Sequence, residues 1–328
     1  MNNKDKIKLG IIGCGAIAER HLEVLKKKDV QLIVAVDANE ATAKQIKEKY
    51  RFESYTTDYR QIYNQVNAVI NCLPNFLHAP ISIDFLKHSI NVLCEKPMAL
   101  NENEAKMMIS AAKETGTILS VANVRRFYWS SKEIKKIITE KSLGEVLEID
   151  AEEGFVFSWK SKSGFFFDRK KAGGGVLLDM GSHLLDLILW FLEDYPVTIS
   201  YKDDNYGGLE ADSELEMYFT RELKVYVKIS RLRNLRNLNR IKLTKGEIFF
   251  RPDECNKILV VNHEGTHTFT EAPVKKAEIK YFEEMMDDFL NSISGTKTLF
   301  IDPNDVLPSI RLIDLCYSKQ KSFKPSWL

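Results

Sequence analysis

Three side chains in the sequence have the types and spacing that proton and hydride transfer require. Lys96 stands in Glu95-Lys96-Pro97, directly after an apolar run, and offers an ammonium group to a developing alkoxide. Asp179 and His183 are four residues apart, so on a helix they share a face. An acid one turn away can orient an imidazole and raise its pKa, as a proton-transfer group requires. A structural polar pair on an apolar helix explains Asp179 and His183 at least as well.

A glycine-rich turn near the start of the chain predicts a dinucleotide site. Gly13-Cys14-Gly15-Ala16-Ile17-Ala18 follows the apolar run at 8–12, in the order strand, turn and helix. Gly13 permits the tight turn, Gly15 lets the backbone approach a phosphate, and Ala18 lets the helix lie close to the strand. The start of the helix then faces the pyrophosphate. The residues predicted to bind the cofactor here are Gly13, Gly15, Ala16, Ile17 and Ala18.

Asp37 indicates which dinucleotide is bound. A second apolar run, 31–36, ends at Asp37, about twenty residues beyond the turn, where the fingerprint places a carboxylate for the ribose hydroxyls. This carboxylate would repel a 2′-phosphate, and no arginine follows it closely, so NAD is favoured over NADP. An alternative is that Asp37 only caps the helix that begins near Glu40.

The elements that must position these residues fall into two predicted domains. Residues 1–123 alternate strands and helices, which predicts an α/β domain with a doubly wound parallel sheet of the Rossmann type. Ligands bind beyond the carboxyl ends of such strands, so the loops at 73–78 and 95–97 are expected at one ligand-binding edge. The strands are predicted near 7–12, 31–37, 67–72, 91–94 and 118–122, and the helices near 16–27, 40–50, 78–88, 102–115 and 129–141.

Residues 124–328 are predicted to form an α+β domain with a large, mostly antiparallel, open sheet. A strongly apolar helix ends near residue 192, and two helices close the chain near 277–293 and 303–319. The predicted strands lie near 146–157, 197–203, 212–219, 223–231, 236–243, 246–251, 257–262 and 266–270.

Composition limits the classes of function. The 328 residues carry a net charge of +1 and are 44% hydrophobic, which is typical of a soluble globular protein and argues against general nucleic-acid binding. No apolar stretch looks long and uninterrupted enough to span a membrane. The 5 cysteines are odd in number and include no C-x-x-C pair, a pattern typical of free thiols in a reducing cytoplasm. No metal is expected.

Taken together, the motifs resemble those of the Gfo/Idh/MocA oxidoreductase family, which includes many sugar and inositol dehydrogenases. The resemblance covers essentially the whole chain. It implies a Rossmann domain, a second domain whose open sheet supports a homodimer or homotetramer, and hydride transfer between a sugar or polyol carbon and the nicotinamide. The segments that carry it are G-C-G-A-I-A, P-N-F-L-H at 74–78, E-K-P at 95–97, V-R-R-F at 124–127 and the segment 173–186 with D-x-G-x-H.

The resemblance also implies roles for individual residues. Lys96 would hydrogen-bond the reacting hydroxyl and hold the nicotinamide edge, and His183 would be the general base in oxidation and the acid in reduction. Asp179 would orient His183 or bind the neighbouring substrate hydroxyl. The other residues expected along the cofactor are Leu73, Pro74, Asn75, His78 and Glu95.

The cationic residues of the sequence do not decide which substrate is bound. Arg126 and Lys162 are expected to border the substrate, and the cations around Lys162 lean towards a phosphorylated or nucleotide-linked sugar. Arg126 has the alternative role of anchoring the linker between the domains. A second cationic run, Arg231 to Lys242, is expected to be a solvated face of neighbouring strands, with a nucleotide-sugar diphosphate or a subunit contact as the alternatives.

Other functions remain open from the sequence. The same fold with bound NAD can support redox-assisted elimination at a glycosidic bond, or a regulator that binds NAD and sugar without chemistry. His263-Glu264-Gly265-Thr266-His267 matches the zinc-protease pattern H-E-x-x-H, but that pattern needs a helix. The glycine and the flanking β-formers predict a hairpin turn instead.

Overall fold

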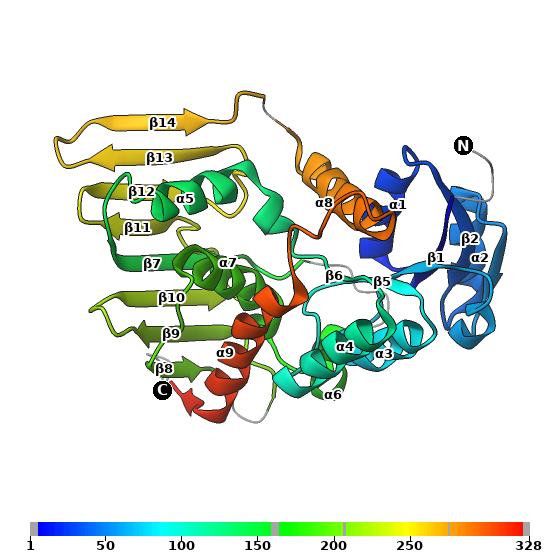
Figure 1. Ribbon diagram of the computed structural model, residues 1–328. Coiled ribbons are helices and arrows are strands. Elements are labelled where there is room, and N and C mark those ends of the chain that lie inside the picture. The colour runs from blue at the N-terminus through cyan, green and yellow to red at the C-terminus, as the bar shows by residue number, and fades with distance from the viewer. Residues whose placement is uncertain (1–5, 159–163, 206–207, 275, 324–328) are drawn as a thin grey trace.

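The structure is a computed structural model that describes residues 6–158, 164–205, 208–274 and 276–323. Its N-terminal part is a six-stranded parallel sheet in the order β3-β2-β1-β4-β5-β6, as the alternation of strands and helices predicted (Figure 1). The chain leaves β1 for β2 on one side and later returns to β4 on the other. The crevice at this switch point is the ligand-binding position of such folds. The elements are β1 (Ile7–Ile12), α1 (Ala16–Leu25), β2 (Val30–Val36), α2 (Glu40–Tyr50), β3 (Ser54–Thr56), β4 (Ala68–Asn71), α3 (His78–Lys87), β5 (Asn91–Cys94), α4 (Glu102–Thr115) and β6 (Leu119–Val121).

The C-terminal part is a nine-stranded mixed sheet in the order β14-β13-β12-β11-β7-β10-β9-β8-β15. Only the β7–β10 and β8–β15 pairs are parallel among the described strands, so the sheet is mostly antiparallel, as predicted. Helices α5 (Trp129–Thr139), α7 (Ser182–Leu192) and α9 (Leu307–Ser318) lie over one face of it (Figure 1). The strands are β7 (Val146–Gly154), β8 (Thr198–Asp203), β9 (Asp212–Tyr218), β10 (Lys224–Ser230), β11 (Asn239–Leu243), β12 (Gly246–Phe250), β13 (Lys257–Asn262), β14 (His267–Glu271) and β15 (Lys321–Ser322).

Helix α8 (Glu278–Ile293) returns to the N-terminal part of the protein. It packs beside α1, and Figure 1 shows the two helices side by side. Its Phe282, Met286 and Phe289 are buried in the same core as the parallel sheet. A single cut at residue 123 therefore does not separate the two cores, because a segment late in the sequence completes the first one.

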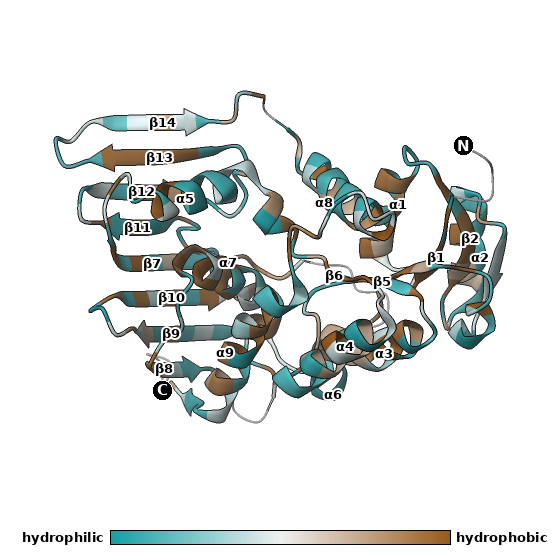
Figure 2. Ribbon diagram, in the orientation of Figure 1, coloured by the Kyte–Doolittle hydropathy of each residue, from teal (hydrophilic) through white to brown (hydrophobic). Residues whose placement is uncertain are grey.

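The apolar segment before residue 192 is a core helix. The helical stretch Arg169–Leu192 is long and apolar enough to cross a membrane, contrary to the expectation from the sequence, but 72% of its most apolar window is buried inside the protein. Figure 2 shows α7 as hydrophobic along most of its length, where it lies against the large sheet. Helix α7 packs against α9 and shares a buried core with the strands of the large sheet, which accounts for its apolar composition.

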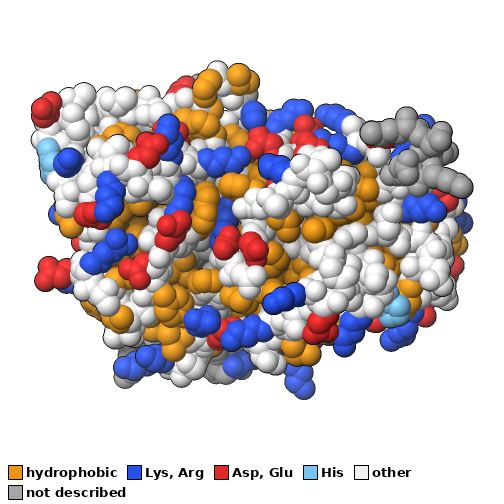
Figure 3. All heavy atoms as spheres, viewed as in Figure 1, with side chains coloured by type: hydrophobic (Ala, Val, Ile, Leu, Met, Phe, Trp, Pro, Cys, Tyr) orange, Lys and Arg blue, Asp and Glu red, His pale blue; other side chains and the backbone are white. Residues whose placement is uncertain are grey.

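The distribution of charged side chains on the surface is consistent with the near-neutral net charge. On the face in Figure 3, cationic and anionic side chains are interspersed rather than gathered by sign. On the large sheet, several charges pair across neighbouring strands, including Lys228 with Glu214 at 2.7 Å and Arg240 with Glu247 at 3.7 Å. Most of the run Arg231 to Lys242 is therefore a solvated face, but Arg231 is not.

The H-E-x-x-H segment is a hairpin turn, as predicted. Strand β13 ends at Asn262 and β14 begins at His267, so the two histidines do not share a helix face. Gly265 takes the left-handed φ of +76° that the turn requires. Within the described ranges, no group of His, Cys, Asp and Glu side chains is arranged to hold a metal ion.

Candidate active site

A cavity of about 980 Å³ lies between the parallel sheet and the large sheet. Its lining comes from both parts of the protein: the glycine turn, the loops after β2, β4 and β5, the segment after β7, the start of α7, and α8. A cavity of this size is at the upper end of the range for ligand sites, so a dinucleotide and a small substrate can share it.

The glycine turn forms one end of the cavity. Gly13 has a φ of +87°, and a Cβ there would lie 2.7 Å from the carbonyl oxygen of Cys72. A Cβ on Gly15 would meet no protein atom within 4 Å, so it would project into space that a phosphate needs. Ala16 and Ile17 also line the cavity, whereas Ala18 is fully buried beneath it and lets α1 approach the sheet. These features fit the pyrophosphate of a dinucleotide at the start of α1.

Asp37 lies at the same end, directly after β2. One carboxylate oxygen accepts a hydrogen bond from the Cys14 backbone N–H at 2.9 Å, and the other accepts one from Asn39 at 2.8 Å. The helix cap is Asn39, whose side chain accepts from the Thr42 N–H, so the alternative role of Asp37 as a cap is wrong. The lining residues that follow Asp37 are Ala38, Asn39 and Thr42, and none of them is a cation that could hold a 2′-phosphate.

We expect Asp37→Ser to weaken NADH binding about tenfold or more, because hydrogen bonds to a charged acceptor are among the stronger ones. Binding of NADPH should weaken less or improve, since the repelling charge is removed. Titration of both nucleotides by fluorescence measures the two Kd values. Glu40→Ser, outside the cavity lining, is the matched control. An unchanged ratio of the two Kd values in Asp37→Ser would contradict the assignment.

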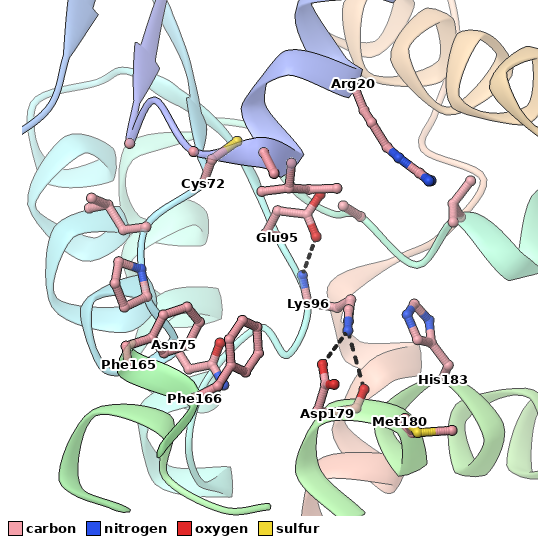
Figure 4. A pocket seen from close by; sticks show the side chains of 18 of the residues that line it. Arg20, Cys72, Asn75, Glu95, Lys96, Phe165, Phe166, Asp179, Met180 and His183 are labelled. Carbon is pink, nitrogen blue, oxygen red and sulfur yellow. Dashed lines mark hydrogen bonds and ion pairs between the residues drawn. The ribbon is translucent and has the colours of Figure 1, made fainter. Parts of the chain in front are cut away.

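Lys96, Asp179 and His183 meet at the other end of the cavity (Figure 4). Lys96 follows β5, and its Nζ donates to the Asp179 carboxylate at 3.0 Å and to the Asp179 carbonyl at 3.2 Å. Asp179 lies in the π-helical turn Leu177–Gly181, and His183 lies in the first turn of α7. The loop after one parallel strand thus brings its lysine against an acid and a histidine from a distant part of the chain.

A glycine-rich segment places the π-helical turn. A Cβ on Gly175 would lie 1.9 Å from the carbonyl oxygen of Glu210, so only glycine fits there. The buried Glu210 carboxylate accepts hydrogen bonds from the backbone of Gly175 and Leu177, at 2.8 Å and 3.1 Å. A third bond comes from the hydroxyl of Tyr317, at 2.8 Å. The segment before Asp179 is therefore fixed on several sides, and π-helical turns often mark functional sites.

The electrostatics set distinct protonation states for the acid and the histidine. Burial alone would raise the pKa of Asp179, but the charges of Lys96 and Arg231 outweigh it and lower that pKa to about 2. Burial lowers the pKa of His183 well below its ordinary value, and the charges of Lys96 and Arg125 lower it further. The expectation that Asp179 raises the pKa of His183 is therefore wrong, because the carboxylate is taken up by the two cations. At neutral pH His183 is an unprotonated imidazole, which can accept a proton.

Arg231 is a site residue that the sequence analysis assigned to a solvated face. It directly follows β10, and its guanidinium forms an ion pair with Asp179. The guanidinium also lies over the rings of Phe157 and Phe166, 4.9 Å and 5.6 Å from their centroids. Only its position at the end of a strand could have pointed to this role, because its partners lie far away in the sequence.

Glu95 and His78 hold the loop at 95–97 in place through buried hydrogen bonds. Glu95 is buried, one carboxylate oxygen lies 2.7 Å from Nε2 of His21, and the other accepts from the Lys96 backbone N–H at 3.1 Å. The two ring nitrogens of His78 each lie 2.7 Å from a backbone carbonyl oxygen, of Pro97 and of Leu73. Burial lowers the pKa of His78, and a neutral ring donates to one of these two carbonyls.

The remaining predicted residues of the cofactor loop also line the cavity. Leu73, Pro74 and Asn75 are part of its wall. The Asn75 side chain donates to the carbonyl of Ala172 at 2.9 Å, which ties the first domain to the segment before Asp179.

Arg126 does not line the cavity, contrary to its predicted contact with the substrate. Its guanidinium is buried and donates to both carboxylate oxygens of Asp186, at 2.8 Å and 2.7 Å. It also donates to the carbonyl of Asp305 at 2.9 Å, so it anchors the linker between the domains, its alternative role. Its neighbour Arg125 faces the cavity instead and pairs with Glu153 at 2.9 Å. Lys162, the other predicted substrate contact, lies outside the described residues.

We expect Arg126→Met to lower the free energy of unfolding by about 3–5 kcal/mol, because it leaves the buried Asp186 carboxylate without its partner. Arg126→Met combined with Asp186→Leu should be less destabilised than the single variant, since no charge is then left buried alone. Urea denaturation of both variants and of the wild type measures this. A single variant as stable as the wild type would contradict the structural role.

The comparisons with known proteins agree with this geometry. Residues 7–123 match the sequence model described as the oxidoreductase family with an NAD-binding Rossmann fold. Residues 131–249 match the GFO/IDH/MocA C-terminal domain, and the two matches together cover more than half of the chain. The chain belongs to the Gfo/Idh/MocA oxidoreductase family. The predicted family and fold class are thereby confirmed, as is the NAD-binding character of the first domain.

The chain is only distantly similar to relatives whose activity is known. The chain is 28% identical to a D-glucoside 3-dehydrogenase of Escherichia coli (strain K12) over 193 residues, which are 57% of this chain and 54% of that protein. It is 27% identical to a glucose-6-phosphate 3-dehydrogenase of Bacillus subtilis (strain 168) over 238 residues, 68% of this chain and 66% of that protein. The chain thus matches between about half and two thirds of the length of these relatives.

A solved structure of levoglucosan dehydrogenase with NADH and levoglucosan superposes with a TM-score of 0.86. The alignment covers 96% of this chain and 97% of that chain at 19% sequence identity, so it shows the same fold.

Proposed function

We propose that the protein is an NAD-dependent dehydrogenase that oxidises a CH–OH group of a sugar or polyol, or reduces the corresponding ketone. The observation that carries this proposal is the meeting of Lys96, Asp179 and His183 at one end of a cavity whose other end is the dinucleotide turn with Asp37. When bound, NAD takes up or returns the hydride and its two electrons at C4 of the nicotinamide.

The protein's own residues handle the proton and the charge. In oxidation, the neutral imidazole of His183 takes the hydroxyl proton as the C–H bond breaks and the C=O bond forms. The ammonium of Lys96 stabilises the negative charge that develops on the oxygen. Asp179 holds that ammonium in place, and Arg231 holds Asp179. In reduction, His183 returns the proton.

We place the protein in the cytoplasm, on the ground that an odd number of cysteines with no C-x-x-C pair is typical of a reducing compartment. The resemblance supports a homodimer or homotetramer formed through the open face of the large sheet. Light scattering of the purified protein measures that state directly.

The absorbance of NADH tests the activity, with NAD and a panel of inositols, aldoses, glycosides and nucleotide sugars. We expect NADH to form with at least one class. If no sugar reduces NAD while NADH still binds, the dehydrogenase proposal fails. Release of an aglycone without net NADH would instead identify redox-assisted elimination, and the absence of both would identify a regulator.

A further inference from the structure

Five apolar side chains line the cavity beyond the catalytic residues and form what is called here the aromatic wall: Phe155, Val156, Phe157, Phe165 and Phe166. Phe165 and Phe166 lie with their ring centroids 4.0 Å apart, and Phe157 and Phe166 lie 5.9 Å apart. In Figure 4, Phe165 and Phe166 lie beside Asn75, across the cavity from His183. The rings of Phe157, Phe165 and Phe166 thus pack against one another, and Phe155 and Val156 extend the apolar lining beside them.

The backbone holds the wall in place. The N–H of Phe155 donates to the carbonyl of Ser230 at 3.0 Å, and the N–H of Phe157 donates to that of Arg231 at 2.9 Å. The segment after β7 therefore continues the pairing with the end of β10. Because Arg231 also pairs with Asp179, the wall begins directly beside the catalytic residues.

Large apolar side chains of the wall remain exposed to the cavity. Phe155 is 42% exposed and Val156 is 58% exposed. Apolar and aromatic side chains that line a cavity of this kind provide most of the contact area for a bound small molecule. A sugar ring placed at Lys96, Asp179 and His183 would carry any substituent on its far side onto this surface.

Each cation among the described lining residues lies beside a carboxylate. Lys96 and Arg231 both contact Asp179, and Arg125 pairs with Glu153 at 2.9 Å. Arg20, the remaining cation among the described lining residues, lies 3.4 Å from the carboxylate of Glu278. Because each of these cations already lies beside a carboxylate, the described lining attracts a phosphate or diphosphate less strongly than unpaired cations would.

The described cations of the loop before Gly173 add no positive charge to the cavity lining. Arg169, Lys170 and Lys171 do not line the cavity, and Lys171 lies 3.4 Å from the carboxylate of Asp168. The sequence had suggested a phosphorylated or nucleotide-linked sugar from this group of cations. Among the described residues, the side chains that face the cavity favour an uncharged substrate instead.

We propose that the substrate is an uncharged glycoside with an apolar or aromatic aglycone, and that the aglycone lies against the aromatic wall. This inference rests on the proposed dehydrogenase function and specifies its substrate class. The sugar hydroxyls face the polar catalytic residues, and the aglycone replaces water on Phe155 and its neighbours.

Initial rates with saturating NAD test the proposal, using methyl and phenyl D-glucosides of both anomers, D-glucose 6-phosphate and UDP-glucose. We expect kcat/KM for a phenyl glucoside to exceed that for the matched methyl glucoside by about tenfold, and the two charged sugars to be poor substrates. Phe155→Ala should remove most of the advantage of the phenyl group, chiefly by raising KM for the phenyl glucoside.

Phe269→Ala is the matched control, because Phe269 lies on β14, is 65% exposed and does not line the cavity. We expect it to leave both substrates unchanged. Equal rates for phenyl and methyl glucosides, or a preference for a charged sugar, would overturn the proposal. So would a Phe155→Ala variant that weakens NADH binding and leaves the phenyl preference intact.

A calorimetric titration separates this inference from the dehydrogenase proposal. Phenyl glucoside is titrated into the NADH-bound protein, with methyl glucoside as the reference. If no sugar reduces NAD but phenyl glucoside binds at least about tenfold more tightly, and Phe155→Ala abolishes the difference, the wall stands while the dehydrogenase proposal fails. Equal binding of the two glucosides would overturn the proposal that the aromatic wall binds the aglycone.

Discussion

Lys96→Met is expected to lower kcat for sugar oxidation by about 10²–10³-fold or more while the Kd for NADH stays close to that of the wild type. The ammonium is the positive group placed between Asp179 and the cavity, 3.0 Å from the carboxylate. Without it, the alkoxide loses the ammonium that stabilises it as the hydroxyl proton leaves, and hydride loss from a neutral alcohol is slow. The dinucleotide turn lies at the other end of the cavity, so nucleotide binding should survive.

Two further variants sharpen this test. Lys96→Arg keeps a positive charge but replaces a compact ammonium by a planar fork, so partial activity is expected. Lys106→Met removes an exposed lysine that pairs with Glu102 and should leave kcat unchanged. If Lys96→Met retains wild-type turnover, the role assigned to Lys96 is wrong.

His183→Asn is expected to lower kcat by about 10²–10⁴-fold, the usual effect of losing a general base. Asparagine is similar in size and polarity but cannot accept the proton. A rate that is no lower than that of the wild type would show that another group takes the proton. Measured Kd values for NADH, unchanged in the variant, would exclude a loss of cofactor binding as the cause.

The pH dependence of the wild-type protein follows from the same residue. Oxidation needs the neutral imidazole, so the rate should fall as pH decreases through the pKa of His183. Burial and the charges of Lys96 and Arg125 lower that pKa, so the acid limb should lie well below the ordinary titration range of histidine. In Lys96→Met one of these charges is gone, and the pKa of His183, followed by NMR, should move upwards. A shift in the other direction would contradict the electrostatic account.

The parts of the site that could be predicted from the sequence are those carried by local motifs. The glycine turn, Asp37 and the loop with Lys96 each follow a predicted strand, and parallel strands place such loops at one edge. Asp179 and His183 share a helix face by spacing alone. These signals need no knowledge of how distant segments pack.

The parts that could not be predicted depend on contacts across the fold. Arg231 looked like its cationic neighbours on β11 because nothing local shows that Asp179, Phe157 and Phe166 surround it. Arg125 and Arg126 stand side by side in one motif, and nothing local indicates which of the two faces the cavity. The fold turns Arg126 into the core and Arg125 into the cavity.

The isotopic composition of NADH tests the central claim most directly. The sugar with the highest rate, deuterated at its ring carbons, is incubated with NAD and the protein, and the NADH is analysed by mass spectrometry. The proposed mechanism predicts that each NADH carries one deuterium, and that Lys96→Met and His183→Asn form almost none. Consumption of the sugar with no deuterium in NADH, or release of an aglycone while NAD stays oxidised, would contradict it.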